Sequence, residues 1–146
     1  MSELYEKSLL KLELDRVLEQ LAERAGSELG KIACRNLRPT SDLEDVQALL
    51  DQTSAACDLS TKKGYPHFYD AQDVSFSLER ADRGGALNPK ELLKIAGTLR
   101  CARTVKGYTA EDEAATVLDG MFMSLTANKY LEDKIFGAIL SEEEIA

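Results

Sequence analysis

The chain has 146 residues, of which 44% are hydrophobic and 30% charged, and this composition excludes a disordered chain. Its length suits a single domain with its own hydrophobic core, so we expect residues 1–146 to form one domain. The 26 acidic side chains outnumber the 18 basic ones, and the net charge of −8 repels nucleic acid except at a local basic patch.

The first 25 residues have apolar side chains at helical spacing. This spacing predicts one or two helices over residues 3–25, with a break near Leu14 where Asp15 would cap the second piece. The apolar stripe consists of Leu9, Leu10, Leu12, Leu14, Val17, Leu18 and Leu21.

Residues 25–36, AGSELGKIACRN, resemble a phosphate-binding glycine loop at first sight. Such a loop needs four residues between its glycines and a Ser or Thr after its lysine, whereas only three residues separate Gly26 from Gly30, and Ile32 follows the lysine. We therefore interpret the stretch as a helix junction, in which Gly26 ends one helix and Ser27 caps the next. The apolar face of that second helix would consist of Leu29, Ile32, Ala33 and Leu37.

A longer helix is predicted after Pro39, which ends the preceding one. Ser41 and Glu44 have the spacing of a capping box, and Gly64 stops the helix. One face of this helix would carry Leu43, Val46, Leu50, Ser54 and Cys57.

An aromatic cluster follows in the linker and is the only one in the chain: Tyr65, Pro66, His67, Phe68 and Tyr69. It either packs over the core or contacts a partner. No Cys or His lies at metal-ligand spacing from the single histidine. Asp73 is expected to cap a short helix, VSFSLERADR, that stops at Gly84 and Gly85.

The next helix has the clearest start in the sequence. Asn88 is the expected cap, Pro89 occupies the first helical position, and Glu91 completes the pattern three residues after the cap. The helix would run to about Lys106 and bury Leu92, Ile95, Ala96, Leu99 and Ala102.

One or two further helices are predicted in AATVLDGMFMSL and KYLEDKIFGAIL, with Asn128 or Thr126 near the second start. We interpret MFM as core, and the acidic runs YTAEDEAA and SEEEIA as solvated charge that favours helix starts. Because no alternating strand pattern occurs, the expected fold is all-α, with about six to seven helices.

Four basic residues on the 89–106 helix raise the question of a nucleic-acid face: Lys94, Arg100, Arg103 and Lys106. Helical spacing does not gather them into one patch. Arg103 lies on the side of the apolar stripe. We therefore expect its aliphatic stem to cover apolar surface and its charged end to pair with an acidic residue. The candidate nucleic-acid or partner contacts are Arg100, Arg103, Lys106, Tyr65 and Phe68.

The sequence predicts no catalytic, cofactor or metal site. The three cysteines are Cys34, Cys57 and Cys101; they are odd in number and lack CxxC spacing, so we expect reduced, partly buried thiols. No uninterrupted apolar run is long enough for a signal peptide or a membrane span, which favours a cytoplasmic location without membrane contact.

Three stretches in order resemble the bacterial MutS-like type-two proteins, paralogues of the mismatch-repair ATPase MutS. They are LLKLELDRVLEQLAERAGSELGKIACRNLRPTSDLEDVQALLDQTSAA, DVSFSLERADRGGALNPKELLKIAGTLRCARTVKGY and NKYLEDKIFGAILSEEEIA. The second stretch carries the family's Gly-Gly, ELL, LR and R residues in order. The resemblance spans essentially the whole chain.

The resemblance implies that the chain is the N-terminal helical core segment of a longer protein and is not itself catalytic. That parent would be a homodimeric ATPase clamp that uses ATP and Mg²⁺, binds branched or mismatched DNA and restrains recombination, or acts on stalled ribosomes. Its ATPase, lever and endonuclease domains would lie downstream of Ile145-Ala146. The chain itself would then be an engineered fragment of that parent. The alternative is a free-standing helical adaptor that binds a partner protein through the GYPHFY cluster.

Overall fold

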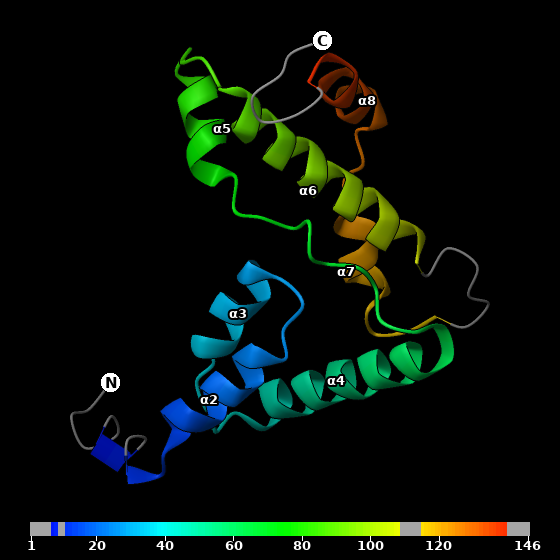
Figure 1. Ribbon diagram of the computed structural model, residues 1–146. Coiled ribbons are helices and arrows are strands. Elements are labelled where there is room, and N and C mark those ends of the chain that lie inside the picture. The colour runs from blue at the N-terminus through cyan, green and yellow to red at the C-terminus, as the bar shows by residue number, and fades with distance from the viewer. Residues whose placement is uncertain (1–6, 9–10, 109–114, 140–146) are drawn as a thin grey trace. The chain divides into compact units, whose positions relative to one another are not determined.

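The computed structural model describes residues 7–8, 11–108 and 115–139, and every regular element within them is a helix (Figure 1). The all-α expectation is confirmed by seven helices in this part of the chain, α2 to α8. Leu9, Leu10 and most of the two acidic runs lie outside the described residues. The chain forms two compact units, Met1–Pro39 and Thr40–Ala146, which we describe separately. That residues 1–146 make one domain stays a prediction.

The first unit begins with α2, Leu14–Glu23. The break near Leu14 is confirmed, but the expected cap at Asp15 is wrong. The chain turns at Glu13, whose φ of 55° is left-handed, and the helix starts directly after it without a side-chain cap. Asp15 therefore lies inside the first turn, where its negative charge still interacts favourably with the helix dipole. Leu18 and Ala22 are the buried residues of α2.

The second helix of this unit is α3, Glu28–Arg35. Its predicted cap is confirmed, because Ser27 Oγ accepts a hydrogen bond from the Gly30 amide at 3.1 Å. Arg35 donates two hydrogen bonds to the Glu19 carboxylate, at 2.7 and 2.8 Å, and so ties α3 to α2. The helix ends four residues before Pro39, and none of its residues is buried.

The second unit begins with α4, Leu43–Lys63. The predicted capping box at Ser41 is wrong, since Asp42 is the cap and its Oδ1 accepts from the amides of Glu44 and Asp45 at 3.0 and 3.1 Å. A carboxylate can serve both amides and also carries the charge that the helix dipole favours. The predicted stop is confirmed at Gly64, which has a φ of 78°.

The predicted face of α4 is largely open. Leu43 and Leu50 are exposed, and only Leu59 is buried among the residues of this helix. The expectation of partly buried thiols is confirmed for half-buried Cys34 and buried Cys101 but is wrong for exposed Cys57. Cys57 is exposed because it lies on this open face.

The linker after α4 runs along a later helix, α6, Pro89–Gly107. Thr98 Oγ1 donates to the carbonyl oxygens of Asp70 and Gln72 at 3.4 Å, and Cys101 Sγ donates to the His67 carbonyl oxygen at 3.4 Å. These contacts hold the backbone of the aromatic segment in place.

Between the linker and α6 lies α5, Ser75–Asp82. The expected cap at Asp73 is wrong, because Val74 is the N-cap residue and makes no side-chain cap hydrogen bond. Asp73 lies one residue earlier, where its carboxylate accepts from the Ser75 amide at 3.0 Å. The helix ends where predicted. Gly84 has a φ of 80°, and the Gly85 amide donates to the Arg80 carbonyl oxygen at 2.9 Å, as in a glycine-terminated helix.

The chain packs tightly at Gly85, which gives a testable consequence. A Cβ at this position would lie 2.7 Å from Arg80 Cγ and 2.9 Å from the Arg80 carbonyl oxygen, so the backbone would have to shift. We expect Gly85→Ala to lower the free energy of unfolding by about 2 kcal/mol in urea denaturation. Gly120→Ala is the control: a Cβ there meets no atom within 4 Å, and we expect a change of less than about 1 kcal/mol. Equal effects at both positions would contradict the packing argument.

The start of α6 has the predicted capping box. The Glu91 amide donates to Asn88 Oδ1, and the Asn88 amide donates to Glu91 Oε2, both at 2.9 Å, with Pro89 at the first helical position. Glu91 also pairs with Arg80, so this cap joins α5 to α6. The predicted end of α6 near Lys106 is also confirmed.

Removal of this cap should be measurable. Asn88→Ala leaves the Glu91 amide without its acceptor, and we expect a loss of about 1 kcal/mol in the free energy of unfolding. Asn88→Ser keeps a hydroxyl acceptor and should differ little from the parent. Thermal unfolding followed by circular dichroism compares the two, and a Ser variant as unstable as the Ala variant would contradict this role.

Two shorter helices complete the described chain: α7, Asp119–Ser124, and α8, Lys129–Ala138. Asn128 is confirmed as the cap of α8, since its Oδ1 accepts from the Leu131 amide at 3.0 Å. The interpretation of MFM as core is wrong for Met121 and Met123, which are both exposed. Phe122 alone lies one turn after the buried Leu118 and so shares its inner face.

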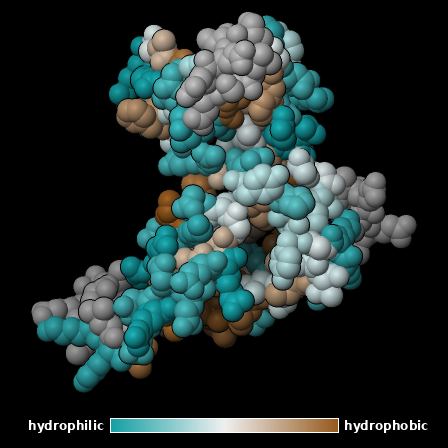
Figure 2. Space-filling view, viewed as in Figure 1, coloured by the Kyte–Doolittle hydropathy of each residue, from teal (hydrophilic) through white to brown (hydrophobic). Residues whose placement is uncertain are grey.

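The main hydrophobic core lies where α6 packs on α8. Its buried members are Ile95, Ala96, Ile135 and Ile139. Leu92 and Leu99 of the predicted stripe pack against this cluster. The view in Figure 2 shows a mostly hydrophilic surface interrupted by separate apolar areas. In the described ranges, no helix has both the length and the apolar character needed to cross a membrane.

Candidate functional site

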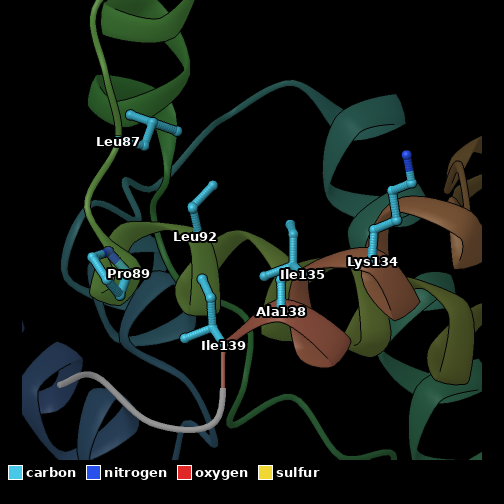
Figure 3. A pocket seen from close by; sticks show the side chains of 7 residues that line it. All are labelled: Leu87, Pro89, Leu92, Lys134, Ile135, Ala138 and Ile139. Carbon is cyan, nitrogen blue, oxygen red and sulfur yellow. The ribbon is translucent and has the colours of Figure 1, made fainter. Parts of the chain in front are cut away.

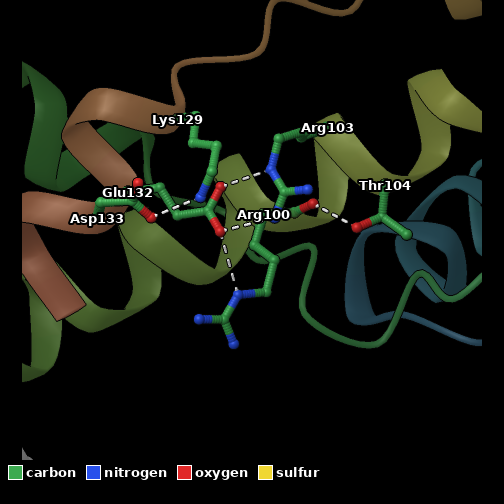
Figure 4. Close-up of polar contacts among 6 residues, drawn as sticks. All are labelled: Arg100, Arg103, Thr104, Lys129, Glu132 and Asp133. Atoms are coloured by element: carbon green, nitrogen blue, oxygen red, sulfur yellow. Dashed lines mark hydrogen bonds and ion pairs between the residues drawn. The ribbon is translucent and has the colours of Figure 1, made fainter.

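A buried carboxylate between α6 and α8 organises the main charge cluster of the second unit (Figure 4). Glu132, on α8, is only 3% exposed. Arg103 donates to it twice, from Nε and Nη2, both at 2.9 Å, and Arg100 Nε donates at 3.3 Å. The buried charge is therefore fully compensated by two cations from one neighbouring helix.

The electrostatics of the cluster follow from these contacts. Chiefly through the hydrogen bonds from Arg103, the pKa of Glu132 falls from its ordinary value of 4.5 to about 2, although burial alone would raise it. The same pair raises the pKa of Arg103. Glu132 is thus ionised at neutral pH and serves as a fixed anion rather than a proton donor.

The structure brings together two of the three candidate cations on α6. Pairing of Arg103 with an acidic residue is confirmed. Arg100 also contacts the carboxylate, and its guanidinium carbon lies 3.9 Å from the centre of the Phe136 ring. Lys106 is not part of the cluster, because its Nζ donates to the Leu125 carbonyl oxygen at 2.8 Å. Whether any of these residues touches nucleic acid or a partner stays a prediction.

Sequence reasoning missed Glu132 as the residue that joins these cations. A signal was present, because Glu132 lies three residues before Ile135 and seven before Ile139, which places it on the buried stripe of α8. A charged residue on an apolar stripe indicates a paired cation from the helix it packs against.

The aromatic candidates lie in the linker, with their side chains turned to solvent. Tyr65 is 85% exposed and Phe68 41% exposed. The rings of His67 and Tyr69 meet edge to face, with centroids 5.9 Å apart. These aromatic side chains are exposed rather than packed over the core, and whether they contact a partner stays a prediction.

An apolar pocket of about 280 Å³ lies at the amino-terminal end of α6, next to α8 (Figure 3). It is lined by Leu87, Pro89, Leu92, Lys134, Ile135, Ala138 and Ile139. Lys134 is the only charged residue of the lining, so the pocket offers apolar contact and little polar recognition. Among the described residues, no group of three or more His, Cys, Asp or Glu side chains is arranged to hold a metal ion.

The sequence matches no protein-family model. It is similar to proteins named Endonuclease MutS2. The protein from Ruminiclostridium cellulolyticum is 39% identical over 144 residues, that from Acetivibrio thermocellus 37% over 145 residues, and that from Clostridium acetobutylicum 34% over 144 residues. Each match covers 97% of this chain and 18% of the relative.

The helical fold and these matches define the class of the molecule as an all-α chain related to MutS-type proteins. More particularly, 97% of the chain matches proteins named Endonuclease MutS2, which confirms the resemblance noted in the sequence. The chain spans about a fifth of the length of these relatives, since 18% of each is matched.

Proposed function

We propose that this chain is the amino-terminal, non-catalytic helical scaffold of a MutS2-type protein. In the proposal, the whole protein is a homodimeric ATPase clamp that uses ATP and Mg²⁺ and has endonuclease activity. Its partner is branched or mismatched DNA, on which it suppresses recombination, or a stalled ribosome. The relatives' name supports the endonuclease activity of the parent.

The scaffold role is supported by the hydrogen bonds that Arg100 and Arg103 donate within the chain. Both direct hydrogen bonds to Glu132, a residue of the same chain that is almost fully buried. Cations engaged in this way hold α8 against α6, and the carboxylate offsets one of their two positive charges. A structural role for the cluster accounts for its geometry without a ligand.

The salt dependence of nucleic-acid binding tests this proposal. In the complete protein, binding to branched DNA and to ribosomes is measured at several salt concentrations, and the logarithm of the binding constant is plotted against the logarithm of the salt concentration. Arg103→Gln should leave the slope of this plot unchanged. A direct phosphate contact by Arg103 would instead reduce the magnitude of that slope by about 0.9. Lys94→Gln is a matched control, because Lys94 is an exposed cation on the same helix.

Deletion of residues 1–146 should impair dimerisation, ATPase activity and binding; unchanged values would contradict a scaffold role.

A second candidate function is a protein-interaction module, favoured by the open aromatic segment. Tyr65 and Tyr69 are 85% and 67% exposed, and exposed tyrosines are common anchors of protein interfaces. Tyr65→Ala with Phe68→Ala should then abolish capture of a protein partner while ATPase activity and DNA binding of the complete protein stay unchanged. Loss of DNA or ribosome binding in this double variant would favour nucleic-acid contact instead.

A further inference from the structure

The longest helix of the chain has one face without charge. We define the open face of α4 as Leu43, Val46, Leu49, Leu50, Thr53 and Cys57. At helical spacing, these side chains share one half of the helix surface, and no Asp, Glu, Lys or Arg lies among them. Leu43, Leu49 and Leu50 are 78%, 53% and 56% exposed, whereas Val46 is half-buried.

The contacts of α4 with its own unit lie on the other side. Leu59 is the buried residue of the helix, and it is nine positions after Leu50, which places the two on opposite faces. The hydroxyl of Tyr108, at the end of α6, donates to the carbonyl oxygens of Leu59 and Gly64 at 3.1 and 2.6 Å. Within the described residues of this unit, no other helix packs along α4.

The spacing of the open face indicates what fits it. Leu43, Val46, Leu50, Thr53 and Cys57 alternate in steps of three and four, which is the seam that receives another helix in side-by-side packing. A surface of leucine and valine without charges is suited to the apolar stripe of an amphipathic helix and gives no recognition of an anionic ligand.

We propose that the open face of α4 is the docking surface for an amphipathic helix from the remaining part of the same MutS2-type polypeptide. The relatives match this chain over 97% of its residues, yet those residues make up only 18% of their length, so a large part of such a polypeptide lies outside it. The proposal rests on the similarity to these relatives and on the face itself, and it is independent of the proposed clamp function.

A tethered helix fits this surface better than a free partner. The apolar part of the seam is short, because after Leu50 it continues with Thr53 and Cys57. A separate molecule would lose translational and rotational freedom for that small area, whereas a segment of the same polypeptide is present at high effective concentration.

The thiol of Cys57 provides a direct test, because it is exposed on the open face. Its rate of modification by N-ethylmaleimide is measured by peptide mass spectrometry in the 146-residue chain and in the complete polypeptide, without nucleotide or nucleic acid. We expect modification at least about tenfold slower in the complete polypeptide, because the docked helix must first open.

The matched control moves the thiol by one residue. In the double variant Cys57→Ser, Asp58→Cys, the introduced thiol lies on the charged side and should react at rates within about twofold in both proteins. Leu50→Asp should restore the reactivity of Cys57 in the complete polypeptide and leave it unchanged in the 146-residue chain.

Three results would overturn the proposal. The first is equal modification of Cys57 in both proteins. The second is concentration-dependent protection in the 146-residue chain, which would identify a second copy as the occupant. The third is equal protection of both thiols, which would reflect general shielding rather than docking. Because no nucleotide or DNA is present, these results do not depend on clamp activity.

Discussion

Ile95→Ala is expected to lower the free energy of unfolding of the second unit by about 3 kcal/mol, within the range for truncation of a buried aliphatic side chain. Ile95 is 8% exposed and belongs to the cluster with Ile135 and Ile139 that holds α8 on α6. Its removal leaves a cavity at the contact on which the position of α8 depends. Urea denaturation followed by circular dichroism measures the effect.

The control for this core truncation is Leu43→Ala on α4. Leu43 is 78% exposed in this chain, so its truncation should change the free energy of unfolding by less than about 0.5 kcal/mol. If both variants lost the same stability, the core between α6 and α8 would not be the dominant packing contact of the unit.

Glu132→Gln is expected to lower the free energy of unfolding by about 2 kcal/mol at pH 7. Gln keeps the size of the side chain but removes the charge that compensates Arg100 and Arg103. The cost stays below that of a fully buried pair because the two arginine side chains are 47% and 38% exposed and water screens them. Asp133→Asn is the control: its pair with Lys129 is well exposed, so we expect less than about 0.5 kcal/mol.

The pH dependence of stability checks the same carboxylate independently. The folded-state pKa of Glu132 is about 2, below its ordinary value of 4.5. A carboxylate with a lowered pKa stabilises the fold above its unfolded pKa, so this contribution should be complete at neutral pH and lost as the pH falls from 4.5 toward 2. In Glu132→Gln, the fall in stability across this window should be smaller, and an unchanged profile would contradict the assignment.

Three helix starts were predicted correctly from a single residue with the right capping chemistry, whereas Asp73 does not cap α5. Ser27, Asn88 and Asn128 cap their helices as expected, because a cap depends on a side chain and amides only two or three residues away. At Ser41, the neighbouring Asp42 offered a better acceptor, so the start moved by one residue. The break near Leu14 was predicted, but the cap at Asp15 was wrong, because the helix starts after a left-handed backbone at Glu13 that residue preference does not indicate.

Burial was predicted less well than helix position. The periodic apolar stripe of α6 packs against α8, and residues such as Ile95 and Ala96 are buried there. The equally periodic face of α4 has no such partner in its unit, so Leu43 and Cys57 are exposed. Periodicity shows which side of a helix is apolar, but whether that side is covered depends on which other helix packs against it.

By itself, the sequence determined the all-α class, the similarity to MutS2 proteins and most helix boundaries, because these depend on local spacing, capping groups and matched residues. Only the tertiary structure decided that Arg100 and Arg103 meet on Glu132. That meeting joins residues about 30 positions apart, as in the pair between Arg103 and Glu132 with its separation of 29. The local patterns indicate that Arg103 and Glu132 are each paired, but which residues meet is fixed by the packing of α8 against α6.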